Sequence, residues 1–123
     1  MKSFEELEVW QISRMIVNQV YAITREGQLA KDFGLCSQLQ RASVSIMSNI
    51  AEGFERLHVP EKIQFYNTSR ASCGEVRSLL YVVGDNYPGL VSRTQELRSL
   101  VIRSGMLVSG LIQSTLNRKT SRS

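Results

Sequence analysis

The sequence predicts an all-α fold, an antiparallel up-down-up-down four-helix bundle, from three observations. Apolar residues recur at steps of three and four along four long segments, which is the spacing of an amphipathic helix. Three short breaks containing Gly or Pro separate these segments, and short connections favour antiparallel neighbours. No stretch shows the strict alternation typical of a strand. A chain of 123 residues supports one core, so we expect one domain over residues 1–117 and a short basic tail over residues 118–123.

The first helix is expected to begin at Ser3, because Glu6 follows three positions later as in a capping box. It is expected to end near Gly27, since glycine readily adopts the left-handed conformation found at helix C-termini. Its apolar stripe consists of Val9, Ile12, Ile16, Val20 and Ile23.

The second helix should start between Asp32 and Gly34 and run to about Leu57. Ser and Asn are only moderate helix formers, so a row of them in mid-helix predicts close packing against another helix or a polar network. The sequence leaves open whether this polar row is structural or a binding surface. The apolar stripe consists of Leu35, Leu39, Ala42, Ile46, Ile50 and Phe54, and the polar row of Arg41, Ser45, Ser48, Asn49 and Glu52.

The third helix should begin near Pro60, which suits a first turn, and end at the turn over residues 85–89. The fourth covers roughly residues 91–116. It has apolar residues off its inward stripe, and an arc this wide predicts a self-association surface. The third helix is expected to bury Ile63, Tyr66, Cys73, Val76, Leu80 and Val83. The inward stripe of the fourth helix consists of Leu97, Leu100, Val101, Ser104, Leu107, Val108 and Leu111. The apolar residues of the fourth helix outside that stripe are Val91, Ile102, Met106 and Ile112.

Charge is unevenly distributed, with a net −2 over residues 1–61 and +6 over residues 62–123. Eleven of the fifteen basic residues are Arg, whose planar guanidinium suits phosphate recognition. This pattern favours an anionic partner, and the alternative is an ordinary solvated basic surface. The candidate nucleic-acid contacts are Arg41, Arg56, Lys62, Arg70, Arg77, Arg118 and Lys119.

The sequence offers no constellation for catalysis or metal binding. It has one histidine, His58, and two widely separated cysteines, so neither a zinc site nor a di-iron site can be assembled. No phosphate-binding loop or nucleophile elbow occurs. We expect a protein that is not an enzyme and holds no metal or cofactor, with Cys36 and Cys73 as buried free thiols. Glu52 is expected to pair with Arg41, and Glu75 with a neighbouring arginine on its own helix.

The N-terminus is unlike a signal peptide, because Glu5, Glu6 and Glu8 follow closely on the first residue. The longest uninterrupted apolar runs are far shorter than the roughly 20 residues needed to span a bilayer. We therefore expect a cytoplasmic protein without a membrane segment.

Three groups of residues together resemble one known family. The first group is Phe4-x-x-Leu7-x-Val9-Trp10-Gln11. The second group, which is the most specific, is Gly34-Leu35-x-x-Gln38-Leu39-x-Arg41-Ala42-x-Val44-Ser45-Ile46-x-Ser48-Asn49-Ile50-Ala51-Glu52-Gly53. The third group combines Gln64-Phe65-Tyr66, Ser69-Arg70 and Ser72 with Glu75. The chain thus resembles, over almost its whole length, the bacterial four-helix-bundle proteins of the 23S ribosomal-RNA intervening-sequence family. The fourth helix matches only in its apolar pattern.

The resemblance implies a bundle that assembles into a ring-like homo-oligomer, a pentamer, with no enzymatic activity. Some members are encoded inside insertions in large-subunit ribosomal RNA genes, and a similar bundle is an accessory subunit of diversity-generating retroelements. The chain departs from the family pattern at Met47, where proline is usual, and at residues 26–29, which replace an aromatic-proline segment. Both departures could alter local helix geometry or oligomer contacts.

Together these features favour a non-enzymatic, oligomeric protein that binds structured RNA or a ribonucleoprotein through phosphate contacts. The alternative is a protein-interaction scaffold, an accessory subunit that docks partners on its helix faces without direct nucleic-acid binding. Weak salt dependence and tolerance of Arg-to-Gln changes would distinguish the scaffold from the RNA-binding protein.

Overall fold

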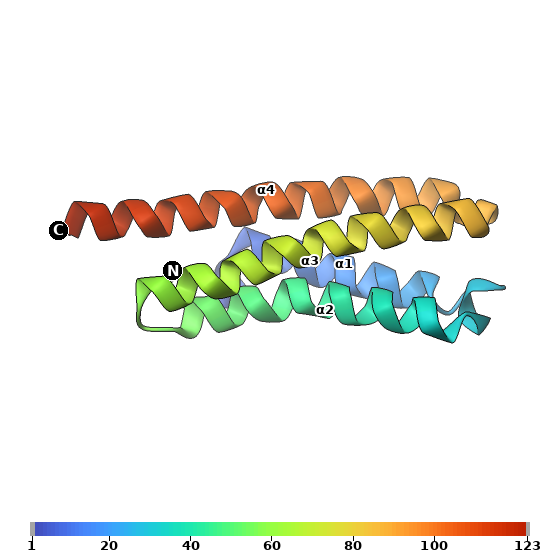
Figure 1. Ribbon diagram of the computed structural model, residues 1–123, viewed down its shortest axis with the longest axis horizontal. Coiled ribbons are helices and arrows are strands. Elements are labelled where there is room, and N and C mark those ends of the chain that lie inside the picture. The colour runs from blue at the N-terminus through green and yellow to red at the C-terminus, as the bar shows by residue number, and fades with distance from the viewer. Residues whose placement is uncertain (1, 123) are drawn as a thin grey trace.

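The computed structural model describes residues 2–122, and the side chains of residues 2–118. This part of the chain contains four α-helices and no strand, which confirms the all-α class (Figure 1). The helices are α1 (Glu8–Ile23), α2 (Phe33–Glu55), α3 (Val59–Asn86) and α4 (Val91–Arg122), and the short 3-10 helices are η1 (Phe4–Glu6), η2 (Leu29–Lys31) and η3 (Pro88–Leu90).

Each helix packs against the next along the chain, and α4 packs against α1. The contacts between α2 and α3 and between α3 and α4 are the most extensive. In Figure 1 the colour advances in opposite directions along α2 and α3, and again along α3 and α4. These contacts are consistent with an up-down-up-down order.

The ends of the helices follow the sequence signals in some places and not in others. The helix α2 begins at Phe33, within the expected range, and Asp32 caps it, since its Oδ1 accepts a hydrogen bond from the Leu35 N–H at 3.2 Å. Pro60 lies in the first turn of α3, as expected. The capping box at Ser3 is wrong, because Ser3 precedes η1, makes no side-chain cap, and α1 begins only at Glu8. Gly27 has a φ of 49°, but it lies in the turn after α1, which already ends at Ile23.

The helix α4 is longer than the sequence pattern indicates. Its backbone continues to Arg122, past the expected end near residue 116. The expected tail over residues 118–123 lies mostly outside the described side chains, and residue 123 lies outside the described chain altogether. The described chain therefore ends in α4, whose backbone stays helical past Leu116, the last apolar residue of the sequence.

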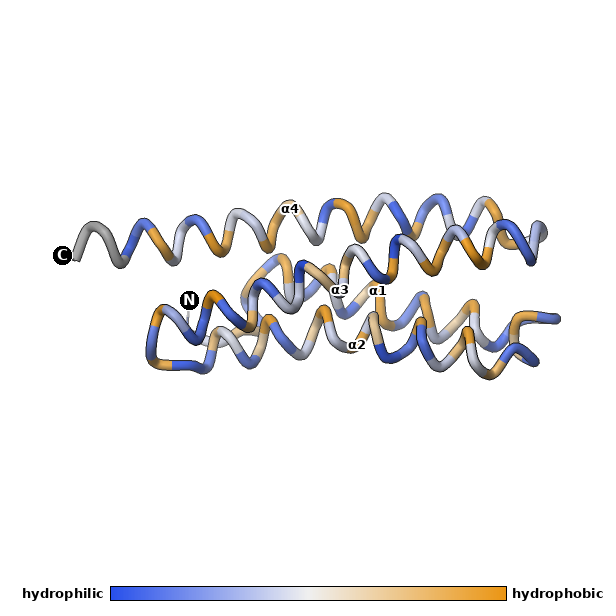
Figure 2. Tube along the Cα trace, viewed as in Figure 1, coloured by the Kyte–Doolittle hydropathy of each residue, from blue (hydrophilic) through white to orange (hydrophobic). Residues whose placement is uncertain are grey.

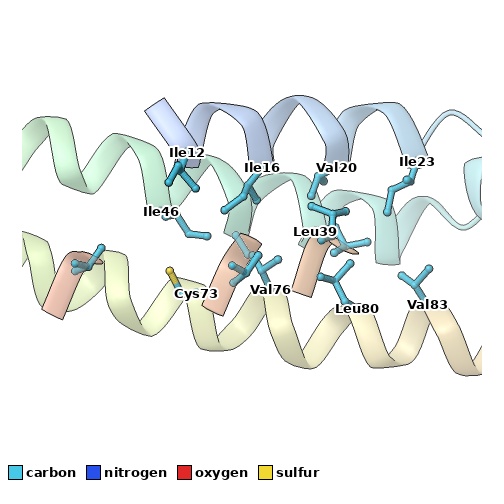
Figure 3. Close-up of a cluster of buried hydrophobic side chains, with 14 of the residues drawn as sticks. Ile12, Ile16, Val20, Ile23, Leu39, Ile46, Cys73, Val76, Leu80 and Val83 are labelled. Atoms are coloured by element: carbon cyan, nitrogen blue, oxygen red, sulfur yellow. The ribbon is translucent and has the colours of Figure 1, made fainter. Parts of the chain in front are cut away.

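The apolar stripes of all four helices meet in one core. Figure 3 shows Ile16 and Val20 from α1 facing Leu39 of α2 and Val76 and Leu80 of α3. Apolar and polar residues alternate around each helix in Figure 2, as an amphipathic packing requires. Both cysteines are buried free thiols, as expected, and burial raises the pKa of each thiol.

A buried polar contact joins α1 to α4 in the middle of this core. The Ser13 Oγ lies 3.2 Å from the Ser104 Oγ, and it also donates to the Val9 carbonyl at 2.7 Å. The Cys73 Sγ approaches the same Ser104 Oγ at 4.0 Å. Because an unpaired buried hydroxyl is costly, this contact favours one register between the two helices.

Near its C-terminal end, α2 approaches α3 so closely that one position tolerates no side chain. A Cβ built on Gly53 would lie 2.5 Å from the Tyr66 Cε1 and 3.2 Å from the Lys62 carbonyl oxygen. The Tyr66 ring is fully buried and cannot move aside without disturbing the core. The glycine that ends the second-helix motif is thus explained by packing.

We expect Gly53→Ala to lower the free energy of unfolding by about 1–3 kcal/mol, because it overpacks the contact with Tyr66. Gly110→Ala is the matched control, since a Cβ there meets no atom within 4 Å. The control should raise stability by up to about 1 kcal/mol through helix propensity. Chemical denaturation measures both variants, and equal effects would contradict this account of Gly53.

Candidate nucleic-acid interface

The polar row of α2 lies partly against α3, and small hydroxyl side chains allow the two helices to approach. The Ser45 Oγ and the Ser72 Oγ are 2.7 Å apart, and the Ser69 Oγ donates to the Ile46 carbonyl at 2.8 Å. Both Ser69 and Ser72 are buried. Close packing and a polar network, the two explanations that the sequence suggested, therefore occur together.

The remaining members of the polar row divide between structure and surface. The Asn49 Nδ2 donates to the carbonyl and to the Oγ of Ser45, at 2.8 and 3.0 Å, so this amide belongs to the α2–α3 network. Arg41, Ser48 and Glu52 are exposed. The expected pairing of Glu52 with Arg41 is wrong, because Glu52 pairs at 3.1 Å with Arg56, the residue that follows the last residue of α2.

The basic candidates whose side chains the structure describes lie in three separate places, and the first is the end of the molecule at the α2–α3 turn. Here the Lys62 ammonium donates to the carbonyls of Gly53 and Phe54 at 3.3 and 2.8 Å. It thus caps the C-terminus of α2, where free carbonyls favour a cation.

Burial lowers the pKa of Lys62, and the nearby positive charge of Arg118 lowers it further.

The other cations at this end are also engaged within the chain. Arg56 pairs with Glu52, and its guanidinium lies 4.6 Å from the centre of the Phe65 ring. The Arg118 Nη2 donates to the Thr115 Oγ1 at 3.4 Å. Lys119, the remaining candidate, lies outside the described side chains. This end is positively charged, but much of its charge stabilises the fold.

The second place is the exposed face of α2, which carries Arg41. This residue borders a hollow of about 410 Å³ that also includes Tyr21 of α1. Arg41 makes no hydrogen bond or ion pair with any described residue. This hollow shares no lining residue with the hollow beside Arg70 and Arg77.

The third place is the seam between α3 and α4, where Arg70 and Arg77 lie two turns apart on one side of α3. Both border a hollow of about 230 Å³ whose lining contains no carboxylate. Neither arginine forms an ion pair or hydrogen bond within the described residues, so the expected pairing of Glu75 with an arginine of its own helix is wrong. The rest of the lining is apolar or small: Cys73, Gly74, Val101, Ile102, Gly105, Met106 and Ser109.

Most other arginines of the C-terminal half are neutralised or covered. Arg103 forms an ion pair with Glu8 of α1 at 2.5 Å, and Arg93 pairs with Glu26. The Arg98 guanidinium stacks on the Tyr81 ring, 4.2 Å from its centre. The net charge of this half therefore overstates how much positive charge is available for a ligand.

A larger hollow lies between the α1–α2 and α3–α4 connections, and the sequence analysis missed it. It measures about 580 Å³ and is bordered by Glu26, Leu29, Tyr87 and Leu90 among others. The Tyr87 hydroxyl donates to the Asp32 Oδ2 at 2.7 Å, and this hydrogen bond, with burial, raises the pKa of Tyr87. The only sequence signals were the turn residues around Gly27 and at 85–89. Its lining contains no lysine or arginine, which makes it a poor phosphate site.

Comparison with protein families supports the resemblance noted in the sequence. A family model described as 23S rRNA-intervening sequence protein matches residues 5–109. The chain belongs to the 23S rRNA-intervening sequence protein family. No curated protein matches it.

The two departures of this chain from the family pattern have simple structural outcomes. Met47 is half-buried inside α2, which continues without interruption from Phe33 to Glu55. Residues 26–29 form a turn in which Gly27 has a positive φ and Leu29 is fully buried at the start of η2. In this family member a buried leucine therefore anchors the first connection.

The outer side of α4 exposes apolar side chains, as the sequence predicted. Met106 is 70% exposed and Ile102 45% exposed, both beside the α3–α4 seam. The stretch Pro88–Arg118 is long and apolar enough to cross a membrane by length and composition alone. The expectation that the chain has no membrane segment considered only uninterrupted apolar runs, which are short here. Arg103 and Ser104 within it contact α1, so α4 takes part in the helix packing.

We expect Lys62→Met to lower the free energy of unfolding by about 1 kcal/mol, because the α2 carbonyls lose their cationic cap. If the protein binds nucleic acid, the salt dependence of that binding should change little. Lys31→Met is the control, an exposed lysine whose removal should leave stability within about 0.5 kcal/mol. Unchanged melting of Lys62→Met together with a reduced salt slope would instead make Lys62 a phosphate contact.

Proposed function

We propose that this protein is a non-enzymatic homo-oligomer that binds structured RNA, or a ribonucleoprotein, through phosphate contacts. In this proposal the helices form an antiparallel up-down-up-down bundle in the cytoplasm, with no membrane segment, metal or cofactor. The observation that carries it is the pair Arg70 and Arg77, which border a hollow without carboxylates and form no hydrogen bond or ion pair within the described residues. The family name, which refers to 23S ribosomal RNA, agrees with this choice of ligand.

Phosphate contacts fit these arginines for a physical reason. A guanidinium without a local carboxylate keeps its full charge for a ligand, and it can bind phosphate oxygens in a bidentate manner. One chain offers only a few such groups. A ring of copies, a pentamer by family resemblance, would repeat them and convert modest affinity per chain into strong avidity.

The distal part of α4 supports self-association. Ser13 of α1 lies against Ser104, and α1 begins at Glu8, so only about one and a half turns of α1 remain to cover α4 beyond that point. Leu111 and Ile112 are consequently only half-buried, and Leu116 is exposed. A second copy of the chain packing here would bury apolar surface that one chain leaves in water.

We expect the double variant Arg70→Gln/Arg77→Gln to weaken binding to a 23S ribosomal RNA fragment. The plot of log affinity against log salt should become shallower by about 0.7–0.9 per arginine lost, since fewer counterions are released. Fluorescence anisotropy across a salt series, with a DNA duplex of equal length for comparison, measures this change.

Arg93→Gln/Arg103→Gln is the matched control, because it removes the same formal charge from arginines already paired with carboxylates. It should change the salt slope much less. No RNA binding by the unmodified protein at about 50 mM salt would contradict the RNA proposal. The scaffold alternative, which the exposed apolar side of α4 favours, would then be the better explanation.

We expect Leu116→Glu to reduce the oligomeric mass measured by sedimentation velocity, because it places a charge in the proposed contact between copies. Asn117→Glu, an equal charge on the neighbouring exposed residue, is the control and should assemble normally. A Leu116→Glu protein that keeps the full oligomeric mass would show that copies meet elsewhere.

A further inference from the structure

The hollow between α3 and α4 exists because glycines from the two helices face it. Gly74 of α3 and Gly105 of α4 both line it, and a Cβ built on Gly74 would meet no atom within 4 Å. A Cβ on Gly105 would approach only the Cys73 Cβ, at 3.8 Å. The core does not require glycine at either position. A glycine inside a helix costs up to about 1 kcal/mol relative to alanine, so these two keep the space open at a cost.

The walls of the hollow combine two kinds of chemistry. Ile102 and Met106 present exposed apolar surface from α4, while Arg70 and Arg77 stand at two levels on α3, roughly 10 Å apart along the helix axis. A volume of about 230 Å³ lies below the roughly 300–1,000 Å³ typical of pockets for drug-sized ligands, so it suits one small flat group. A ligand that is flat and apolar at its centre and anionic on either side matches this arrangement.

An aromatic platform continues the same row. Tyr81 lies one turn after Arg77 on α3, is 57% exposed, and is held by the stacked guanidinium of Arg98. Protein surfaces that alternate cations with exposed aromatic rings are typical of single-stranded nucleic-acid binding, where bases stack and phosphates pair with arginine. A duplex, whose bases are stacked inside, could not use the hollow.

We propose that the α3–α4 seam binds an unpaired segment of RNA, with one base in the hollow between Gly74 and Met106 and a neighbouring base on Tyr81. Arg70 and Arg77 hold the phosphates on the two sides of the inserted nucleoside. This inference rests on the proposed RNA-binding function and specifies which part of a structured RNA the seam recognises, namely a loop or bulge. An acidic amphipathic helix of a partner protein is the competing occupant, and it would need no base recognition.

Gly74→Leu tests the proposal, because it fills the hollow from an exposed backbone position and leaves both arginines in place. Affinity for a short oligouridylate should fall by about tenfold, the effect of losing one stacked base. Affinity for an abasic chain of the same length and charge should not change. Gly34→Leu, at another open glycine outside the hollow, is the control and should bind both chains like the unmodified protein. Circular dichroism confirms folding of each variant.

The remaining outcomes separate this inference from the function on which it rests. If Gly74→Leu binds oligouridylate as tightly as the unmodified protein, or if both chains lose affinity equally, the base site is wrong while RNA binding stands. If the unmodified protein binds an acidic amphipathic peptide at this seam but binds neither the oligouridylate nor the abasic chain, both the base site and the RNA function are wrong.

Discussion

The close approach of α2 and α3 is the constraint on which the other features depend. Gly53 lets the Tyr66 ring fill the space against α2, and the Ser69 hydroxyl bonds directly to the Ile46 carbonyl. This approach also brings the Lys62 ammonium to the last carbonyls of α2, so that one side chain closes both the turn and the helix end. With α2 and α3 fixed in this way, the opposite side of α3 is left to meet α4.

Net charge alone is a poor guide to a ligand surface, and this chain shows why. Arg56 and Arg103 are paired with Glu52 and Glu8, and Arg98 is stacked on Tyr81. Lys62 faces a helix end. What distinguishes Arg70 and Arg77 is a surrounding of apolar and small side chains. A guanidinium in such a setting has no internal competitor for a phosphate, and the low polarity of its neighbours strengthens that contact.

The buried faces of the helices could be predicted from sequence, because apolar residues spaced three and four apart lie on one side of a helix, and that side packs into the core. Ile16, Leu39 and Leu80 are fully buried as expected. The start of α1 could not be predicted, since η1 interposes a 3-10 turn that a capping-box spacing does not detect. The candidate cations were predicted only as a set of residues, and the structure places those that it describes in three regions. That division depends on which helices meet, and no local pattern encodes it.

In the proposed function two successive stretches of α4 would serve different purposes without conflict. Near Ile102 and Met106 the helix borders the unpaired arginines, so a ligand there gains both charge and apolar contact. Beyond the reach of α1 the helix exposes the apolar side chain of Leu116, so burial against apolar surface is the gain that a contact there offers. A contact between copies at the distal part would leave the α3–α4 seam open on every chain. Assembly and ligand binding would then reinforce each other through avidity without competing for the same residues.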